Sequence, residues 1–179
     1  PDGRAPVLLP AVVPLRRVDG AAPLEQTVSA GPLKILVAVG APDESKTRNS
    51  VLDLEHELQG ILDALETAIE HGNAEVRILE VGHPQQIAAA LKRDPYHVLH
   101  LSCHGSPGLI ELEDEDGNPV PIDAARLADT LRSAGRPLPL VFLATCHGGS
   151  PAGETVSFAQ ALIHAGIPQV LAMQTRVTD

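Results

Sequence analysis

The feature that most restricts the fold of this chain is a regular alternation between short aliphatic runs and longer stretches with helical periodicity. The aliphatic runs predict strands buried on both faces, and they lie at 33–39, 76–81, 97–102, 138–144 and 169–173. Helical periodicity is found at 49–72, 84–92, 123–134 and 155–165. Asn49 or Ser50 is the expected capping residue of the first of these helices, and Asp123 is that of the third. Because strand and helix alternate in this way, we expect an α/β fold with a mainly parallel central sheet.

The composition agrees with a single aliphatic core. The 179 residues include one Tyr, two Phe and no Trp, whereas 44% of them are hydrophobic. A chain of this length usually forms one domain, and a core of Leu, Val, Ile and Ala suits helices packed on a buried sheet. The formal net charge is -10, and the sequence has no basic patch interleaved with aromatic residues. We therefore expect no direct binding of nucleic acid.

Proline marks the boundary of the predicted domain. Residues 1–32 are rich in Pro, Gly and Ala and predict an extended arm or linker, whereas 33–179 carry the strand and helix pattern. No apolar run approaches the roughly 20 residues that a membrane-spanning helix needs. There is no signal-peptide pattern, and Cys103 and Cys146 are too few for a disulfide framework. We therefore expect a cytoplasmic protein that does not insert into a membrane.

An acidic segment follows the predicted strand at 97–102. Residues 109–120 alternate apolar and acidic side chains around Asp116 and Gly117, a pair that favours hairpin turns, so we expect a small β-hairpin. Its acidic side chains are expected to form a solvated surface. A calcium or recognition site is the alternative, although the spacing does not match an EF-hand loop. The residues concerned are Glu111, Glu113, Asp114, Glu115 and Asp116.

Two similar segments carry the candidate chemistry. HLSCHGSPG at 100–108 and FLATCHGGS at 142–150 each place Cys-His-Gly just past an aliphatic strand. If these strands are parallel neighbours, their carboxyl ends lie side by side and His104 can meet the Cys146 thiol. An imidazole that takes the proton of a thiol of pKa about 8.5, or stabilises the thiolate, produces a nucleophile. The N–H groups of Gly105 and Cys146 would serve an oxyanion, so the pattern favours acyl transfer.

These segments resemble the CHAT domains of the caspase and separase clan, in which a strand ending in His-Gly precedes a strand ending in a nucleophilic Cys. The hairpin ELEDEDG, the helix IDAARLADTLRSA and the closing AGIPQVLAMQTRVTD are part of the resemblance. It implies a caspase-like three-layer α/β/α sandwich with His104 as general base, Cys146 as nucleophile and Gly105 as oxyanion donor. The caspase signature Q-A-C-x-G is absent, so specificity for aspartate is not implied. The family fold is longer, which implies that 33–179 lack its C-terminal part.

The resemblance also implies a function. It points to a cysteine endopeptidase that cleaves partner proteins in a regulated signalling or defence pathway, without a cofactor and with attached repeat or sensor domains. The substrate would be a protein or peptide, and the acidic chain slightly favours a basic residue before the cut. Because the family includes inactive relatives, a catalytically inactive interaction module is the alternative.

A zinc site is a rival interpretation of the same residues, because they offer nitrogen and sulfur ligands. The candidate ligands are His100, Cys103, His104, Cys146 and His147. Alternate residues of a strand face opposite ways, which directs His100 and Cys103 apart and disfavours a shared metal ion. By the same alternation, we expect Cys103 to be a buried neighbour of the catalytic His and not a second nucleophile.

Overall fold

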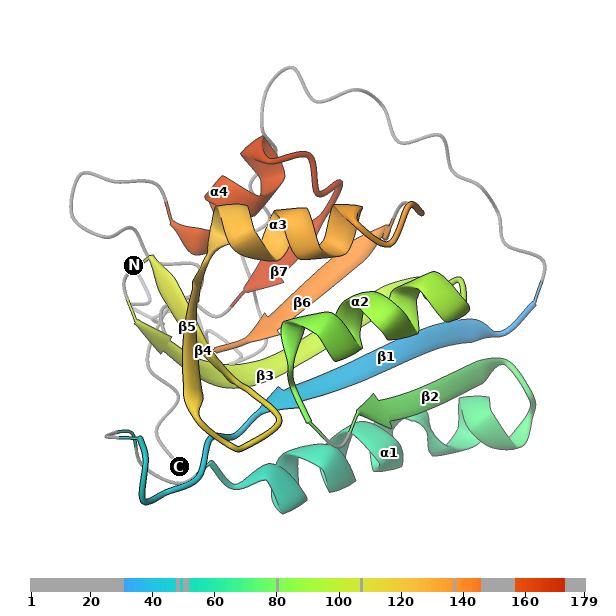
Figure 1. Ribbon diagram of the computed structural model, residues 1–179. Helices are drawn as coiled ribbons and strands as arrows, with labels where there is room; N and C mark the ends of the chain where they lie inside the picture. Colours follow the sequence, from blue (N-terminus) through green and yellow to red (C-terminus); the bar gives the residue numbers. More distant parts are fainter. Residues whose placement is uncertain are drawn as a thin grey trace, which may run out of the picture.

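A computed structural model of the chain describes residues 31–47, 49, 52–79, 81–106, 108–136, 138–145 and 157–172. The predicted arm at 1–32 lies almost wholly outside these residues. The strands are β1 (Leu33–Gly40), β2 (Ala74–Leu79), β3 (Val98–Ser106), β4 (Leu109–Glu113), β5 (Pro119–Asp123), β6 (Leu140–Ala144) and β7 (Val170–Ala172). The helices are α1 (Leu54–Glu70), α2 (Pro84–Arg93), α3 (Ala124–Arg132) and α4 (Phe158–His164). Helix and strand alternate as predicted (Figure 1).

The strands of the described residues form one sheet. Its parallel part has the order β2-β1-β3-β6-β7. The strands β4 and β5 form an antiparallel hairpin that pairs with the carboxyl end of β3. The central strand β3 therefore lies between β1 and β6, and its register places Ser102 opposite Ala144. The predicted hairpin and the predicted adjacency of the strands before His104 and Cys146 are both confirmed.

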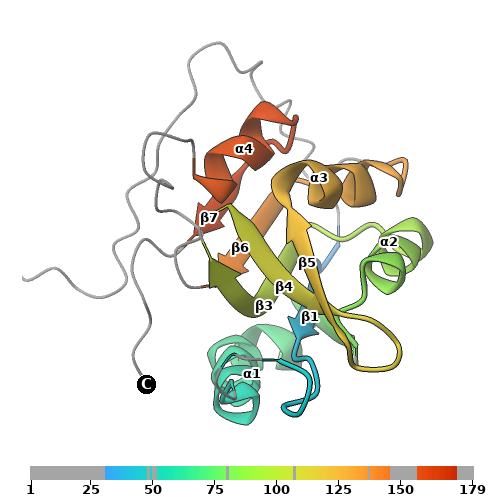
Figure 2. The same cartoon turned by 60° about the vertical axis from the view of Figure 1, so that its left-hand side comes forward.

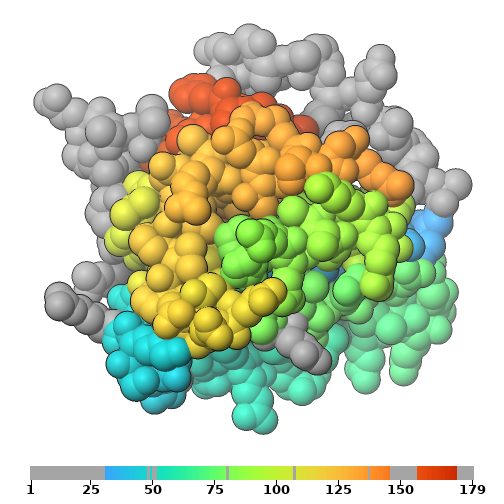
Figure 3. Space-filling view, in the orientation of Figure 1, coloured from blue at the N-terminus to red at the C-terminus, as the bar shows by residue number. Residues whose placement is uncertain are grey.

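Helices cover the two faces of the sheet. The helices α2, α3 and α4 lie together on one face and α1 lies on the other, as two views of the ribbon agree (Figures 1 and 2). The space-filling view shows α2 and α3 side by side, with the β4–β5 hairpin next to them (Figure 3). The expected three-layer α/β/α architecture is therefore confirmed. None of the helices in the described ranges combines the length and apolar character needed to cross a membrane.

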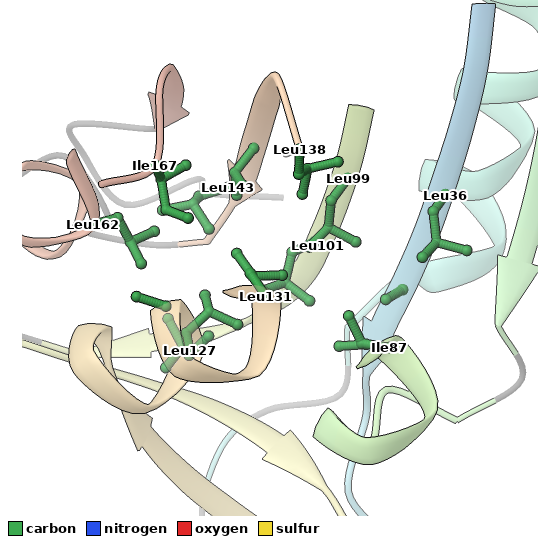
Figure 4. Packing of buried hydrophobic residues seen from close by; sticks show 14 of the residues in the cluster. Leu36, Ile87, Leu99, Leu101, Leu127, Leu131, Leu138, Leu143, Leu162 and Ile167 are labelled. Atoms are coloured by element: carbon green, nitrogen blue, oxygen red, sulfur yellow. The ribbon is translucent and has the colours of Figure 1, made fainter. Parts of the chain in front are cut away.

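The main core lies between the sheet and the three helices α2, α3 and α4, and it is aliphatic as predicted (Figure 4). Leu36, Leu99 and Leu101 of the sheet belong to the same cluster as Ile87 of α2 and Leu127 of α3. Each of these side chains is less than 2% exposed. Burial of one such side chain stabilises the fold by about 1.5–3 kcal/mol, so this layer fixes the position of β3 firmly.

The helix α1 packs more loosely on the other face. Ile35, Val37 and Val39 of β1 are buried beneath it, but α1 has no fully buried residue of its own. Its contact with the sheet is made by partly buried apolar residues, among them Leu58 and Leu65. A polar contact with β3, described below, also joins α1 to the sheet.

The start of α1 differs from the prediction. The sequence suggests Asn49 or Ser50 as the capping residue, but the helix begins later, and the Asp53 carboxylate caps it by accepting from the N–H of His56 at 3.1 Å. The side chain of Asn49 bonds instead to Glu111 on β4. Ser50 lies outside the described residues. The residues before Asp53 are thereby available to line a cleft.

Candidate active site at the carboxyl end of β3

Strand β3 extends beyond the point at which the sequence predicts its end. Cys103 and His104 were expected just past the strand, but β3 continues to Ser106. The cause is β4, which pairs antiparallel with this end of β3 and places His104 opposite Glu111. The backbone of His104 is therefore held in a strand ladder, which orders it more than a loop would.

Side-chain alternation divides the residues of β3 between the two faces of the sheet. Cys103 belongs to the main core on the side of α2 and α3. His100 and Ser102 face α1, where both bond to Glu57. His104 follows Ser102 by two residues, so it lies on the same face of the sheet as His100 and Ser102, and it is partly buried. The imidazole thus stands on the α1 side of the sheet, away from the main core.

A cleft of about 780 Å³ opens beside His104. Its other lining residues come from the end of β1, the segment that leads to α1, and the first residue of that helix. They are Ala41, Pro42, Asp43, Glu44, Ser45, Thr47, Asn49, Leu52 and Leu54. The volume falls within the range of roughly 300–1,000 Å³ that is typical of ligand sites. His104 therefore borders a space large enough to receive part of a peptide.

Glu111 ties the wall of this cleft to the strands that hold His104. Its Oε1 atom accepts hydrogen bonds from Thr47 Oγ1 at 2.7 Å and from Asn49 Nδ2 at 2.8 Å. Both donors line the cleft, whereas Glu111 is the cross-strand neighbour of His104. The position of the wall relative to the imidazole is thereby fixed by hydrogen bonds.

A second set of contacts joins the same wall to the hairpin turn. The N–H of Asp43 donates to the carbonyl of Gly117 at 2.9 Å, and Lys46 Nζ donates to the carbonyl of Asp116 at 2.5 Å. The Asp43 carboxylate accepts from the hydroxyl and the N–H of Ser45, and these hydrogen bonds lower the pKa of Asp43. Asp43 therefore stays ionised and gives this wall of the cleft negative charge.

Glu113 is a buried carboxylate that bonds to Ala41 of the cleft lining. It is 9% exposed, and its Oε1 atom accepts from the N–H groups of Ala41 at 3.3 Å and Gly82 at 3.2 Å. The expectation that the acidic residues of the hairpin form a solvated surface is therefore wrong for Glu113, and Glu111 is only partly buried. The expectation fails because the segment before α1 folds over this face of the hairpin.

Cys103 is buried, as expected, with an exposed fraction of 2%. Burial raises the pKa of its thiol strongly, and the negative charges of Glu57 and Glu111 raise it further, although a hydrogen bond with the backbone of Glu111 acts in the opposite direction. A thiol in such surroundings stays protonated and is a poor nucleophile. The prediction that Cys103 is a buried neighbour of His104 is therefore confirmed as far as its burial is concerned.

The second half of the predicted pair lies outside the described residues. These residues include the buried Thr145, and Cys146 follows it in the sequence. His147 is likewise outside them, and so is the N–H of Cys146 that was assigned to the oxyanion with Gly105. Within the described ranges, no group of three or more His, Cys, Asp or Glu side chains could hold a metal ion.

Sequence reasoning missed a polar network on the α1 face of β3. Glu57 Oε1 accepts from His100 Nε2 at 3.0 Å, and Glu57 Oε2 accepts from Ser102 Oγ at 2.5 Å. Burial raises the pKa of Glu57, but the hydrogen bonds from His100 and Ser102 outweigh this effect and lower it. One signal was present in the sequence, because Glu57 lies three residues after Leu54 and four before Ile61, a spacing that places its carboxylate on the apolar side of the helix.

Comparison with known proteins adds a family assignment. The family model of the CHAT domain matches residues 3–179. No curated protein matches the chain.

Proposed function

Since this match covers nearly the whole chain, the protein belongs to the CHAT domain family, which is related to the caspase-like cysteine peptidases, and we propose that it is a cysteine endopeptidase. In this proposal Cys146 is the nucleophile, His104 is the general base, and the backbone N–H groups of Gly105 and Cys146 receive the oxyanion. Its substrate is a partner protein in a regulated signalling or defence pathway.

The register between β3 and β6 is the observation that carries the proposal. The two strands are parallel neighbours, and Ser102 pairs with Ala144. In the sequence, His104 and Cys146 each follow this pair by two residues. Such a register favours a meeting of the imidazole and the thiol at one edge of the sheet, which is where ligands bind in open α/β folds.

The chemistry of the pair accounts for peptide cleavage. His104 takes the proton of Cys146, and the thiolate adds to the carbonyl carbon of the substrate, whose oxygen becomes an oxyanion. Collapse of this intermediate breaks the C–N bond, and His104 returns the proton to the leaving amine. Water then hydrolyses the thioester and releases the carboxylic acid, which regenerates the thiol.

The cleft beside His104 supplies the binding site in this proposal. Asp43 and Glu44 line its wall, and Asp43 is held in its ionised form by Ser45. A negative wall attracts cationic side chains and repels acidic ones. We therefore expect a basic residue before the cut, in agreement with the absence of the caspase signature around Cys146.

The direct test is covalent labelling with acyloxymethylketone peptides that carry Arg, Lys or Asp next to the reactive group. The protein should form an adduct at Cys146, with Arg or Lys preferred over Asp. Mass spectrometry of the intact protein and of its peptides measures the adduct and its position. The adduct should persist in Cys103→Ala and disappear in Cys146→Ala.

Two outcomes would contradict the proposal. An adduct that survives in Cys146→Ala would assign the nucleophile to another residue. The absence of any adduct, including after addition of candidate activating partners, would favour an inactive interaction module instead.

A further inference from the structure

A half-buried carboxylate joins α1 to the strand that carries His104. Both oxygens of Glu57 are engaged, one by the imidazole of His100 at 3.0 Å and the other by the hydroxyl of Ser102 at 2.5 Å. The side chain of His100 is 14% exposed and that of Glu57 is 32% exposed, whereas Ser102 is 2% exposed. Hydrogen bonds to an ionised acceptor are stronger than those between neutral groups, and shielding from water strengthens them further.

The same imidazole also contacts the neighbouring strand. The rings of His100 and Phe142 stack with centroids 4.8 Å apart and an angle of 11° between their planes. These two residues are partners in the register of β3 and β6. In the sequence, His100 precedes His104 by four residues, and Phe142 precedes Cys146 by four. Glu57 therefore reaches, through His100, both strands that lead to the proposed catalytic pair.

A simple anchor for α1 would not require this chemistry. The residues of β1 beneath the helix are Ile35, Val37 and Val39, and they pack against its apolar side chains. Well-packed apolar residues often stabilise a fold as much as a buried ion pair does, because they carry no cost of removing charge from water. Hydrogen bonds add a defined direction, which fixes the positions of His100 and Ser102 more tightly than apolar contact would.

The arrangement is not a second catalytic centre. A serine nucleophile needs its hydroxyl hydrogen-bonded to a base such as histidine. The hydroxyl of Ser102 donates to Glu57 instead, and the imidazole of His100 bonds to the other oxygen of the same carboxylate. The network thus holds side chains in place and does not activate one of them.

We propose that Glu57, His100 and Ser102 form a positioning network that sets the relative placement of the strand ends bearing His104 and Cys146. The inference rests on the proposed function, because it assigns the network to that catalytic pair. It also links the pair to the cleft, since Glu57 lies one turn after Leu54, which lines the cleft wall. Glu57 is accordingly a positioning residue in this proposal, as are His100 and Ser102.

The test separates reaction from binding in the labelling of Cys146. The whole chain is incubated with increasing concentrations of the best acyloxymethylketone peptide, which yields a limiting rate of adduct formation and a half-saturating concentration. Glu57→Ala should lower the limiting rate by about 10-fold to 100-fold, because small misplacements of reacting groups have effects of this size. The half-saturating concentration should change little, because Thr47 and Asn49 still hold the cleft wall.

The conservative variant provides the decisive comparison. In Glu57→Gln, the amide oxygen can accept from His100 while the amide nitrogen donates to the Ser102 hydroxyl, so the limiting rate should recover to within a few-fold of the wild-type value. Ser102→Ala removes one of the two hydrogen bonds and should reduce the same rate by a smaller factor than Glu57→Ala. It is the second variant in case Glu57→Ala does not fold.

His97→Asn is the matched control. His97 precedes the opposite end of β3, where its Nδ1 atom accepts from the N–H of Lys34 at 2.9 Å, and this variant should keep the wild-type limiting rate. Wild-type limiting rates in folded Glu57→Ala and Ser102→Ala would overturn the inference while the proposed function stands. A wild-type protein that forms no adduct at Cys146 would overturn both.

Discussion

Glu113 and Glu115 are close together on one hairpin, yet their surroundings differ. Glu113 is buried and accepts from the N–H groups of Ala41 and Gly82, whereas Glu115 is exposed in the turn. Gly82 itself lies against β1, since a Cβ atom there would be 2.1 Å from the carbonyl oxygen of Val39. The Glu113 carboxylate thus joins the loop that follows β1 to the loop that follows β2. At position 82 there is no room for a side chain.

Removal of this carboxylate should destabilise the protein. Glu113→Ala leaves two N–H groups without their acceptor, and the expected loss is about 2–3 kcal/mol in the free energy of unfolding. Glu113→Gln keeps one acceptor oxygen and should lose less. Urea denaturation measures both, with the exposed Glu115→Ala as a control that should stay within about 0.5 kcal/mol of the wild type. Equal effects of Glu113→Ala and Glu115→Ala would refute the structural role of Glu113.

Sequence patterns could not identify this role. Along β4, Ile110 and Leu112 alternate with Glu111 and Glu113, which predicts one apolar and one solvated face. The face that carries the carboxylates is covered by the segment before α1, whose donors are about 60 to 70 residues away in the sequence. Only the fold brings such distant segments together. The alternation of apolar and acidic residues therefore predicted the strand but not the burial of the Glu113 carboxylate.

At the scale of the elements, α1 is held to β3 through a titratable group. The pKa of Glu57 is lowered in the folded protein, because the hydrogen bonds from His100 and Ser102 outweigh the effect of burial. The stabilising contribution of Glu57 is therefore fully present above its unfolded pKa of roughly 4.3 and is lost as the pH falls through the lower, folded value. Acid should weaken the docking of α1 by this route.

The free energy of unfolding should accordingly fall less steeply in Glu57→Gln than in the wild type as the pH is lowered from about 5 to 3. Thermal or urea denaturation at a series of pH values measures this difference. Glu66 is an exposed carboxylate on the same helix, so Glu66→Gln should keep the wild-type pH dependence. Superimposable profiles for the wild type and Glu57→Gln would show that Glu57 does not contribute to acid sensitivity.

Most elements were predictable because their signals are local. The aliphatic runs of β1 and β6 and the cap of α3 at Asp123 depend on neighbours in the sequence. The extension of β3 through His104 was not predictable in this way, since it results from pairing with β4. The cap of α1 was misassigned because Asn49 and Asp53 are both suitable residues, and the bond from Asn49 to Glu111 decides between them.

At the scale of the whole molecule, the order of the sheet brings together the two strands, β3 and β6, that lead into the two similar Cys-His-Gly segments. The predicted neighbouring strands are adjacent, with the register that favours a meeting of His104 and Cys146. The three layers and the aliphatic core also follow from the alternation of helix and strand. The cleft could not be predicted, because its wall depends on hydrogen bonds between the hairpin and the segment before α1.

The most direct test of the proposed pair is the pH dependence of Cys146 alkylation by iodoacetamide, measured in a Cys103→Ala background. With His104 present, the imidazolium stabilises the thiolate, so the apparent pKa of Cys146 should lie well below the ordinary value of about 8.5. In His104→Ala, the pKa should return towards that value and alkylation at neutral pH should slow accordingly. Identical profiles with and without the imidazole, both centred near pH 8.5, would contradict the assignment of His104 and Cys146 as a catalytic pair.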